Sequence, residues 1–216
     1  MNYPITIVDN FFEDADAILD MANSYEFYFT DDGRWPGSRT NQIFDLNRRF
    51  YNYLNDKIHL LHYEKPPEYT KLSAHFQKIE PLGDSQWDKR NQGWIHQDYS
   101  YFGGIIFLNK NPSPDSGTSI YKAKNGYVST FNEECKCKRS LYLGEEINLD
   151  KYNEAWNNNN DQYIETVTVQ NVYNRLLMFN GNTHHGVKTF GTQARLTLNF
   201  FGLEMAGSTP PLLRIN

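Results

Sequence analysis

The pattern of hydrophobic and polar residues changes near residue 70, which predicts two parts within the chain. Before this point, apolar residues recur every three or four positions up to about Ser24 and again over residues 45–61. This is the spacing of amphipathic helices. We expect Asp9 or Asn10 to cap the first helix. Residues 30–37 are rich in turn formers and predict a loop between the two helices.

From residue 72 onward, short apolar segments alternate with Gly- and Pro-rich turns, which predicts β-strands. Many short strands separated in this way are typical of a sandwich or jelly roll. A long polar insertion, residues 124–161, interrupts them and contains one expected helix near residues 149–156. The expected strands are residues 72–79, 93–99, 104–108, 118–122, 163–169, 175–179, 184–188 and 196–201.

Length and composition favour one domain. The 216 residues suffice for one sizeable core and are few for two, so we expect a single domain with helical support over residues 1–65 and a jelly roll over residues 72–203. The formal net charge of -5, from 21 basic and 26 acidic residues, gives no nucleic-acid footprint. No segment approaches the roughly 18 apolar residues of a membrane span.

Two further features indicate the setting of the protein. The two cysteines, Cys135 and Cys137, lack the second pair that a structural zinc site needs, so we expect reduced thiols. Residues 1–12 do not have the pattern of a secretion signal. A cytoplasmic location fits both observations best.

The central chemical motif is His96-Gln97-Asp98. On a strand, alternate side chains share a face, so His96 and Asp98 would point the same way with backbones about 7 Å apart. An imidazole and a carboxylate at this spacing can occupy two adjacent positions around a metal. Taken alone the motif is weak, because two polar residues on a solvated strand face have the same spacing.

A second cluster near the C-terminus offers a third ligand. The strand expected at residues 175–179 leads to a turn followed by His184 and His185, and either histidine can complete the set. Two histidines and one carboxylate on one face of an octahedron suit Fe(II) and leave positions open for a cosubstrate and O2. Zinc accepts the same ligands, whereas Mg and Ca prefer more oxygen ligands.

Arg195 and Thr197 follow this cluster on one face of the last expected strand. A guanidinium and a hydroxyl side by side can bind a carboxylate through charge-assisted hydrogen bonds. A surface ion pair on an edge strand is the alternative and would mean little. Because both halves of a metal motif are present, we expect the carboxylate anchor.

These motifs resemble the 2-oxoglutarate/Fe(II)-dependent dioxygenases of the prolyl-hydroxylase-like branch, which has many bacteriophage members. The resemblance covers residues 72–201 apart from the insertion. It implies a double-stranded β-helix, the cupin-like jelly roll, with N-terminal helices packed outside. The matching segments are residues 94–98, 106–109, 115–121, 174–179, 185–187 and 195–197.

The resemblance also implies a role for each candidate site residue. His96, Asp98 and His185 correspond to the catalytic metal triad. Arg195 corresponds to the partner of the distal carboxylate of 2-oxoglutarate, with Thr197 beside it. The implied cofactors are Fe(II), the cosubstrate 2-oxoglutarate and O2.

Two details depend on the family pattern. His185 is preferred to His184 because it begins a His-x-Val sequence and stands ten residues before the arginine. Family members often carry a cosubstrate-binding tyrosine on the strand where this chain has Phe107. Tyr121 and Gln77 are the candidates to replace it.

The implied activity is hydroxylation of a peptidyl, prolyl-like substrate or of a small molecule, with release of succinate and CO2. Two other functions fit the same fold: a non-redox cupin-like metal enzyme and a binding module with a degenerate site. The arginine and threonine beyond the third ligand favour the dioxygenase.

The insertion is expected to lie over the open mouth of the barrel and to act in substrate capture. Tyr127, Phe131, Tyr142 and Trp156 would close over a bound substrate and exclude water, as lids do. Residues 157–161 are polar, so we expect this part to open easily.

Overall fold

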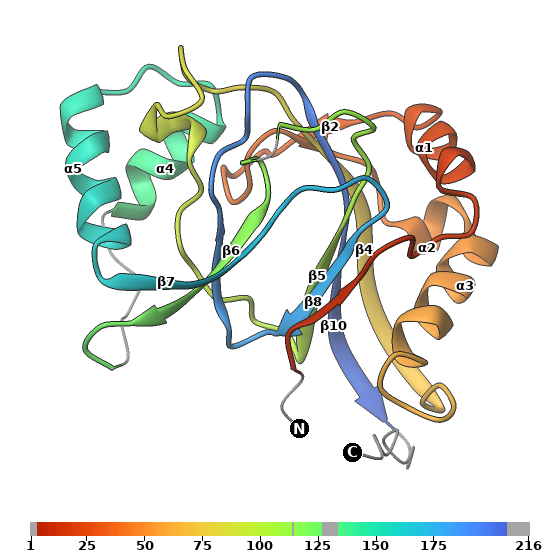
Figure 1. Ribbon diagram of the computed structural model, residues 1–216. Coiled ribbons are helices and arrows are strands. Elements are labelled where there is room, and N and C mark those ends of the chain that lie inside the picture. Colours follow the sequence, from red (N-terminus) through yellow and green to blue (C-terminus); the bar gives the residue numbers. More distant parts are fainter. Residues whose placement is uncertain (1–3, 114, 127–133, 207–216) are drawn as a thin grey trace.

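The described part of the chain, residues 4–113, 115–126 and 134–206 of the computed structural model, consists of two antiparallel β-sheets with helices outside them (Figure 1). This arrangement confirms the predicted mainly-β jelly roll. The seven-stranded sheet has the order β1 (Thr6–Val8), β8 (Leu176–Asn180), β5 (Phe102–Phe107), β10 (Arg195–Ala206), β4 (Tyr69–Ile79), β3 (Ser38–Arg39) and β2 (Tyr28–Phe29). The three-stranded sheet has the order β7 (Tyr163–Val169), β6 (Thr118–Ala123) and β9 (His184–Val187).

The helices of the described residues form two groups on opposite sides of the molecule (Figure 1). The first group, beside the larger sheet, contains α1 (Ala15–Asn23), α2 (Ile43–Leu46) and α3 (Arg48–His59). The second group, within the insertion, contains α4 (Glu134–Tyr142) and α5 (Leu149–Asn160). A short 3-10 helix, Lys89–Asn91, lies outside the insertion in the sequence. None of the described helices is long and apolar enough to cross a membrane.

Alternation along β4 and β10 separates a face packed on the helices from a face that points between the sheets. Leu198 pairs with Phe76 on one side and Ile106 on the other. All three are buried in one core with Leu54 and Ile58 of α3. Because successive side chains of a strand alternate, the intervening residues of β4 and β10 point toward the smaller sheet.

A second, smaller core lies between the sheets and is formed by Phe107, Ile120, Leu177 and Phe179 together with Val169. The cluster contains residues of both sheets, and burying each large apolar side chain contributes about 1.5–3 kcal/mol to folding. It therefore stabilises the packing of one sheet on the other. It also supplies an apolar wall beside the polar residues of the inner face.

The first helix begins later than the sequence predicted. Its cap is Asp14, whose carboxylate accepts a hydrogen bond from the backbone amide of Ala17 at 2.9 Å, and not Asp9 or Asn10. Asn10 adopts a left-handed backbone with φ 52°, and Phe12 beyond it is 3% exposed. The chain therefore anchors in the core before it enters the helix.

The second predicted helix is divided at Asn47 into α2 and α3. The backbone of Asn47 is extended, with φ −152°, and its side chain accepts a hydrogen bond from the amide of Phe50 at 3.0 Å. Asparagine favours caps over helix interiors, so the helix breaks at Asn47. The apolar stripe predicted from the sequence is therefore shared between α2 and α3. Five elements of the described residues were not predicted, namely β1, β2, β3, the short 3-10 helix and α4. The three strands are too short to show alternation.

Candidate active site

A cavity of about 370 Å³ lies between the two sheets, and the insertion contributes Lys138 and Tyr142 to its lining. The insertion therefore borders the cavity, and its expected role as a cover over the mouth of the barrel stays a prediction. Tyr127 and Phe131, two other residues of the expected cover, lie outside the described residues. Trp156 lies under the ammonium group of Lys89, which is 5.5 Å from its ring centre.

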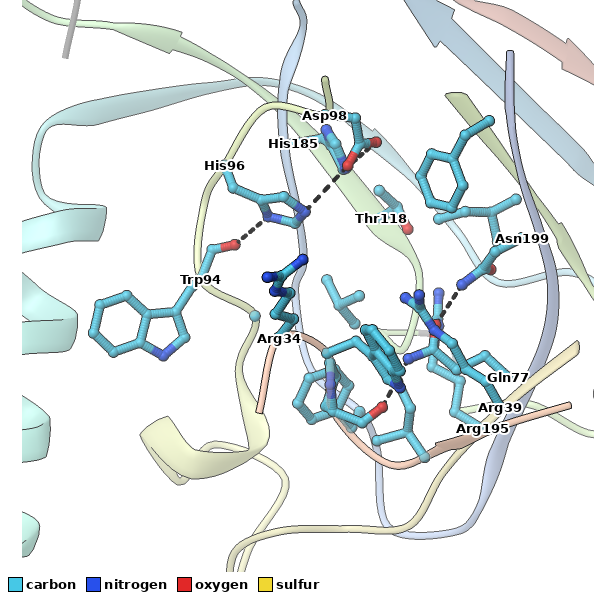
Figure 2. Close-up of a pocket in the computed structure, with 18 of the residues that line it drawn as sticks. Arg34, Arg39, Gln77, Trp94, His96, Asp98, Thr118, His185, Arg195 and Asn199 are labelled. Atoms are coloured by element: carbon cyan, nitrogen blue, oxygen red, sulfur yellow. Dashed lines mark hydrogen bonds and ion pairs between the residues drawn. The ribbon is translucent and has the colours of Figure 1, made fainter. Parts of the chain in front are cut away.

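His96, Asp98 and His185 converge at one side of this cavity (Figure 2). The Nε2 atom of His185 lies 3.4 Å from Asp98 Oδ2, and that of His96 lies 3.8 Å from Asp98 Oδ1. The ligand atoms of all three lie within 4.8 Å of one another. Because metal–ligand bonds are about 2.0–2.2 Å long, three atoms at this separation can bind a single ion.

Backbone carbonyls orient both imidazoles. His96 Nδ1 lies 2.8 Å from the carbonyl oxygen of Trp94, and His185 Nδ1 lies 2.9 Å from that of Thr183. A carbonyl can only accept, so each Nδ1 donates and each Nε2 keeps its lone pair for a metal. Although 41% of the His96 side chain is exposed, desolvation and then the neighbouring His185 lower the pKa of His96 well below its usual value, which favours the neutral ring that binds metals.

The strand predicted for residues 93–99 does not form, and an isolated bridge at His96 takes its place. Backbone hydrogen bonds join Gly93 to Val187 at 2.8 Å and His96 to His185 at 2.9 and 3.0 Å. Residues 93 to 96 therefore span three residue steps, whereas the paired residues 185 to 187 span two. One extra residue produces a β-bulge, which interrupts the ladder. The two ligands of this segment nevertheless reach the same metal position.

Helix α5 holds the other edge of this segment through two asparagines. Asn160 Oδ1 accepts a hydrogen bond from the amide of Ile95, and its Nδ2 donates to the carbonyl of Gly93, both at 3.1 Å. Asn159 Nδ2 donates to the carbonyl of Ile95 at 3.1 Å. Asn159 is buried, and these amides satisfy backbone groups that a neighbouring strand would otherwise bind. The polar composition of residues 157–161, from which easy opening was expected, did not indicate these contacts.

His184, the alternative third ligand, lies away from the cluster. It alternates with His185 along β9 and so points to the opposite face. Its ring stands 4.8 Å from that of Tyr163, and burial, followed by His185, lowers its pKa. The structure therefore brings His185, and not His184, to the other two candidate ligands.

Arg195 is buried in the cavity wall, with 3% of the residue exposed. Its Nε donates to the carbonyl of Ser116 at 3.0 Å, and its Cζ lies 5.4 Å from the ring centre of Phe107. Its Nη2 is buried and has no partner among the described residues. Burial lowers the pKa to about 10, so the group is charged at neutral pH. A buried cation with an unused donor favours an anionic ligand.

Two threonines of the inner strands, Thr118 and Thr197, have buried hydroxyls. Thr197 follows Arg195 on the same face of β10, as predicted, but it is not among the residues that line the cavity. Thr118 of β6 does line the cavity, and it was missed because no motif in the sequence marks it. Both hydroxyls are buried and unpartnered within the described residues. Of the candidates for the absent tyrosine, Gln77 lines the cavity and Tyr121, within the part described, does not.

The fold and the site together define a jelly-roll protein with a candidate two-histidine, one-carboxylate metal centre. The chain belongs to a family of unknown function, DUF6445, whose model matches residues 1–201. No curated protein matches it in sequence.

Solved structures share the fold at low sequence identity. HygX from Streptomyces hygroscopicus, with nickel, 2-oxoglutarate and hygromycin B bound, has a TM-score of 0.57 and 12% identity, covering 94% of this chain and 84% of that chain. The non-haem alpha-ketoglutarate-dependent epimerase SnoN from nogalamycin biosynthesis has a TM-score of 0.52 and 11% identity, covering 93% and 77%.

Proposed function

We propose that the protein is an Fe(II)- and 2-oxoglutarate-dependent dioxygenase. His96, Asp98 and His185 bind the metal, and Arg195 binds the distal carboxylate of 2-oxoglutarate, with Thr197 beside it. The observation that carries the proposal is the presence, in one cavity, of a three-ligand cluster and a buried guanidinium with an unused donor.

The residues present fit both groups. Two imidazoles and one carboxylate suit Fe(II) and leave coordination positions open. HygX structures contain nickel with 2-oxoglutarate and, separately, iron, which supports this choice of metal and cosubstrate. When bound, iron and 2-oxoglutarate supply the oxidising chemistry, in which O2 converts 2-oxoglutarate to succinate and CO2 and provides the oxygen atom for hydroxylation.

The protein's own residues orient and enclose the reactants. The ring of Phe179 lies 4.4 Å from that of His185 and restricts the imidazole. Gly103 leaves space for the carboxylate, because a Cβ there would stand 3.0 Å from Asp98 Oδ2. The apolar cluster between the sheets keeps water from one wall of the cavity.

Finer parts of the proposal remain predictions. These are hydroxylation of a small-molecule or peptide substrate, membership of the prolyl-hydroxylase-like branch with phage-type relatives, one domain over residues 1–216, and a cytoplasmic location. The described residues fit a dioxygenase better than a non-redox cupin-like enzyme or a degenerate binding module. Neither alternative requires the unpartnered Nη2 of Arg195 in the cavity with the metal cluster.

An anaerobic titration tests the proposal directly. Adding Fe(II) and 2-oxoglutarate to the protein is expected to produce the weak visible absorption of an iron–2-oxoglutarate chelate, and adding O2 is expected to convert 2-oxoglutarate to succinate. Asp98→Ala is the matched control, which should show neither signal. A wild-type protein that binds the metal but gives no chelate absorption would favour a non-redox metal enzyme.

A further inference from the structure

The cavity contains a second arginine, Arg39 of β3, that neither the metal centre nor the cosubstrate anchor uses. Its guanidinium stacks on the indole of Trp35, with Cζ 4.4 Å from the ring centre. Its Nη2 donates to Gln77 Oε1 at 3.3 Å. Arg39 Nε and Trp35 Nε1 are buried and lack partners among the described residues. This stacked pair of side chains therefore has two donors without acceptors among the described residues.

Arg39 and Arg195 come from different strands of the larger sheet, β3 and β10, and both line the cavity (Figure 2). Arg39 lies beyond β4, where it pairs with Gln77, whereas the guanidinium of Arg195 lies toward β5, over Phe107. Burial lowers the pKa of Arg39 to about 9 while Asp98 raises it, and burial alone lowers that of Arg195. Asp98 therefore favours the charged form of Arg39, which stays charged at neutral pH.

The charges of the loaded site balance without Arg39. A divalent metal, the carboxylate of the triad, doubly charged 2-oxoglutarate and Arg195 together carry no net charge. The described lining then includes three more cationic residues, Arg34, Arg39 and Lys138, and no further carboxylate. Arg34 is paired with Asp32 at 2.7 Å. Because the whole chain has a net charge of -5, the basic lining is a local property of the cavity.

We propose that Arg39, with the indole N–H of Trp35, binds an anionic oxygen group, a carboxylate or a phosphate, on the substrate. This inference rests on the proposed dioxygenase and names its substrate class. A guanidinium offers two parallel donors to such a group, and stacking on Trp35 holds its plane. Gln77 is itself fixed, because its Nε2 donates to the carbonyl of Pro36 at 2.7 Å and its Oε1 also accepts from Asn199.

Small aromatic probes test this site without knowledge of the substrate. Binding of phenylacetate, phenyl phosphate and neutral phenylacetamide is measured by ligand-observed NMR on protein loaded with Ni(II) and saturating 2-oxoglutarate. The amide cannot make a charge-assisted contact, so we expect it to bind up to about tenfold more weakly than the better anion. A preference for phenyl phosphate would indicate a phosphate monoester substrate, and a preference for phenylacetate a carboxylic acid.

Four variants assign the preference to named atoms. Arg39→Gln should remove it, Arg39→Lys should keep part of it, and Trp35→Phe should weaken it because the ring remains but the donor is lost. Arg34→Gln is the matched control, since Arg34 is exposed and already paired, and should retain the preference. Thermal denaturation identifies any variant that does not fold. If Arg39→Gln does not fold, the anion preference of Trp35→Phe still tests the proposed site.

Three results would overturn the inference: equal binding of amide and anions, an unchanged preference in Arg39→Gln, or weaker 2-oxoglutarate binding in Arg39→Gln but not in Arg195→Leu. The last would make Arg39 the cosubstrate anchor. Binding of 2-oxoglutarate to the wild type is measured separately. Its absence would defeat the proposed dioxygenase, while the anion preference of the nickel-loaded protein would still report on Arg39.

Discussion

The side-chain carboxamide of Asn160 binds the backbone amide of Ile95 at 3.1 Å, one residue before the first histidine of the metal cluster. The same carboxamide also binds the carbonyl of Gly93. Asn160 belongs to α5, which lies in the insertion between the strands of the jelly roll. The segment that carries two of the three candidate ligands therefore depends on a helix outside the barrel.

We expect Asn160→Ala to weaken metal binding. The change removes both hydrogen bonds and leaves backbone groups unpaired, which costs about 1–3 kcal/mol of stability, and outer-shell changes typically lower metal affinity about 10–100-fold. Chelator competition measures the affinity, and urea unfolding measures the stability. Asn158→Ala, at an exposed position of the same helix, is the control. Equal metal affinity in the two variants would show that the bulged segment holds its shape without the hydrogen bonds of Asn160.

The choice between adjacent histidines is tested by His185→Ala and His184→Ala. The first removes a candidate ligand, so we expect loss of metal binding and of iron-dependent turnover of 2-oxoglutarate. The second removes a ring that packs on Tyr163, so we expect most metal binding to remain. Isothermal titration with Ni(II) under matched conditions compares them. Retained binding in His185→Ala with loss in His184→Ala would reverse the assignment.

His96 and Asp98 are tested by the same reasoning. Either His96→Ala or Asp98→Ala should abolish iron-dependent succinate formation, because each removes one of three ligands from the cluster. The circular dichroism spectrum should remain close to that of the wild type, since neither side chain belongs to the apolar cores. Undiminished succinate formation in either variant would contradict the proposed metal triad.

Arg195→Leu is expected to weaken 2-oxoglutarate binding far more than metal binding. Removing one partner of a buried charge pair costs about 3–5 kcal/mol, which corresponds to about a hundredfold loss of affinity or more. Arg195→Lys should be partly defective, because lysine keeps the charge and loses the planar fork. Titration of the nickel-loaded protein gives both affinities. An unchanged affinity for 2-oxoglutarate in Arg195→Leu would exclude the arginine as the anchor.

Stability of the metal-free protein should fall between pH 6.5 and pH 4, partly because of His59. Its ring packs edge-on against Phe102, and burial, followed by His62, lowers its pKa from 6.5 to about 4. The unfolded chain thus takes up a proton below pH 6.5, whereas the folded protein does so only near pH 4. This difference destabilises the folded state by up to about 3 kcal/mol as the pH falls through that window.

Urea unfolding across this pH range measures the effect, with His59→Phe as the comparison. The variant should show a shallower loss of stability because it has no proton to take up at this position. Buried His75, whose pKa is lowered by burial and then by Arg39, changes stability in the same direction in both proteins. Equally steep profiles for the two proteins would mean that His59 is protonated alike in the folded and unfolded states.

Local patterns in the chain predicted most strands and a sandwich or jelly roll, whereas the double-stranded β-helix with helices outside it was implied by the resemblance. Period-two alternation in β10 placed Arg195 and Thr197 on one face and the leucines on the other, and the structure has the same arrangement. This property depends on residues close together in sequence, where backbone geometry alone sets the direction of a side chain. His96 and Asp98 share one metal position as predicted, although the strand assumed for them does not form.

Contacts between distant segments account for what these patterns missed. The bulge before His96 depends on pairing with β9 some ninety residues later in the chain, and the amides of α5 that hold this segment lie in a tract that reads only as polar. Arg39 joins the cavity because a two-residue strand pairs with the end of β4. Such placements follow from burial and hydrogen bonding between remote parts of the chain, which no local period in the sequence records.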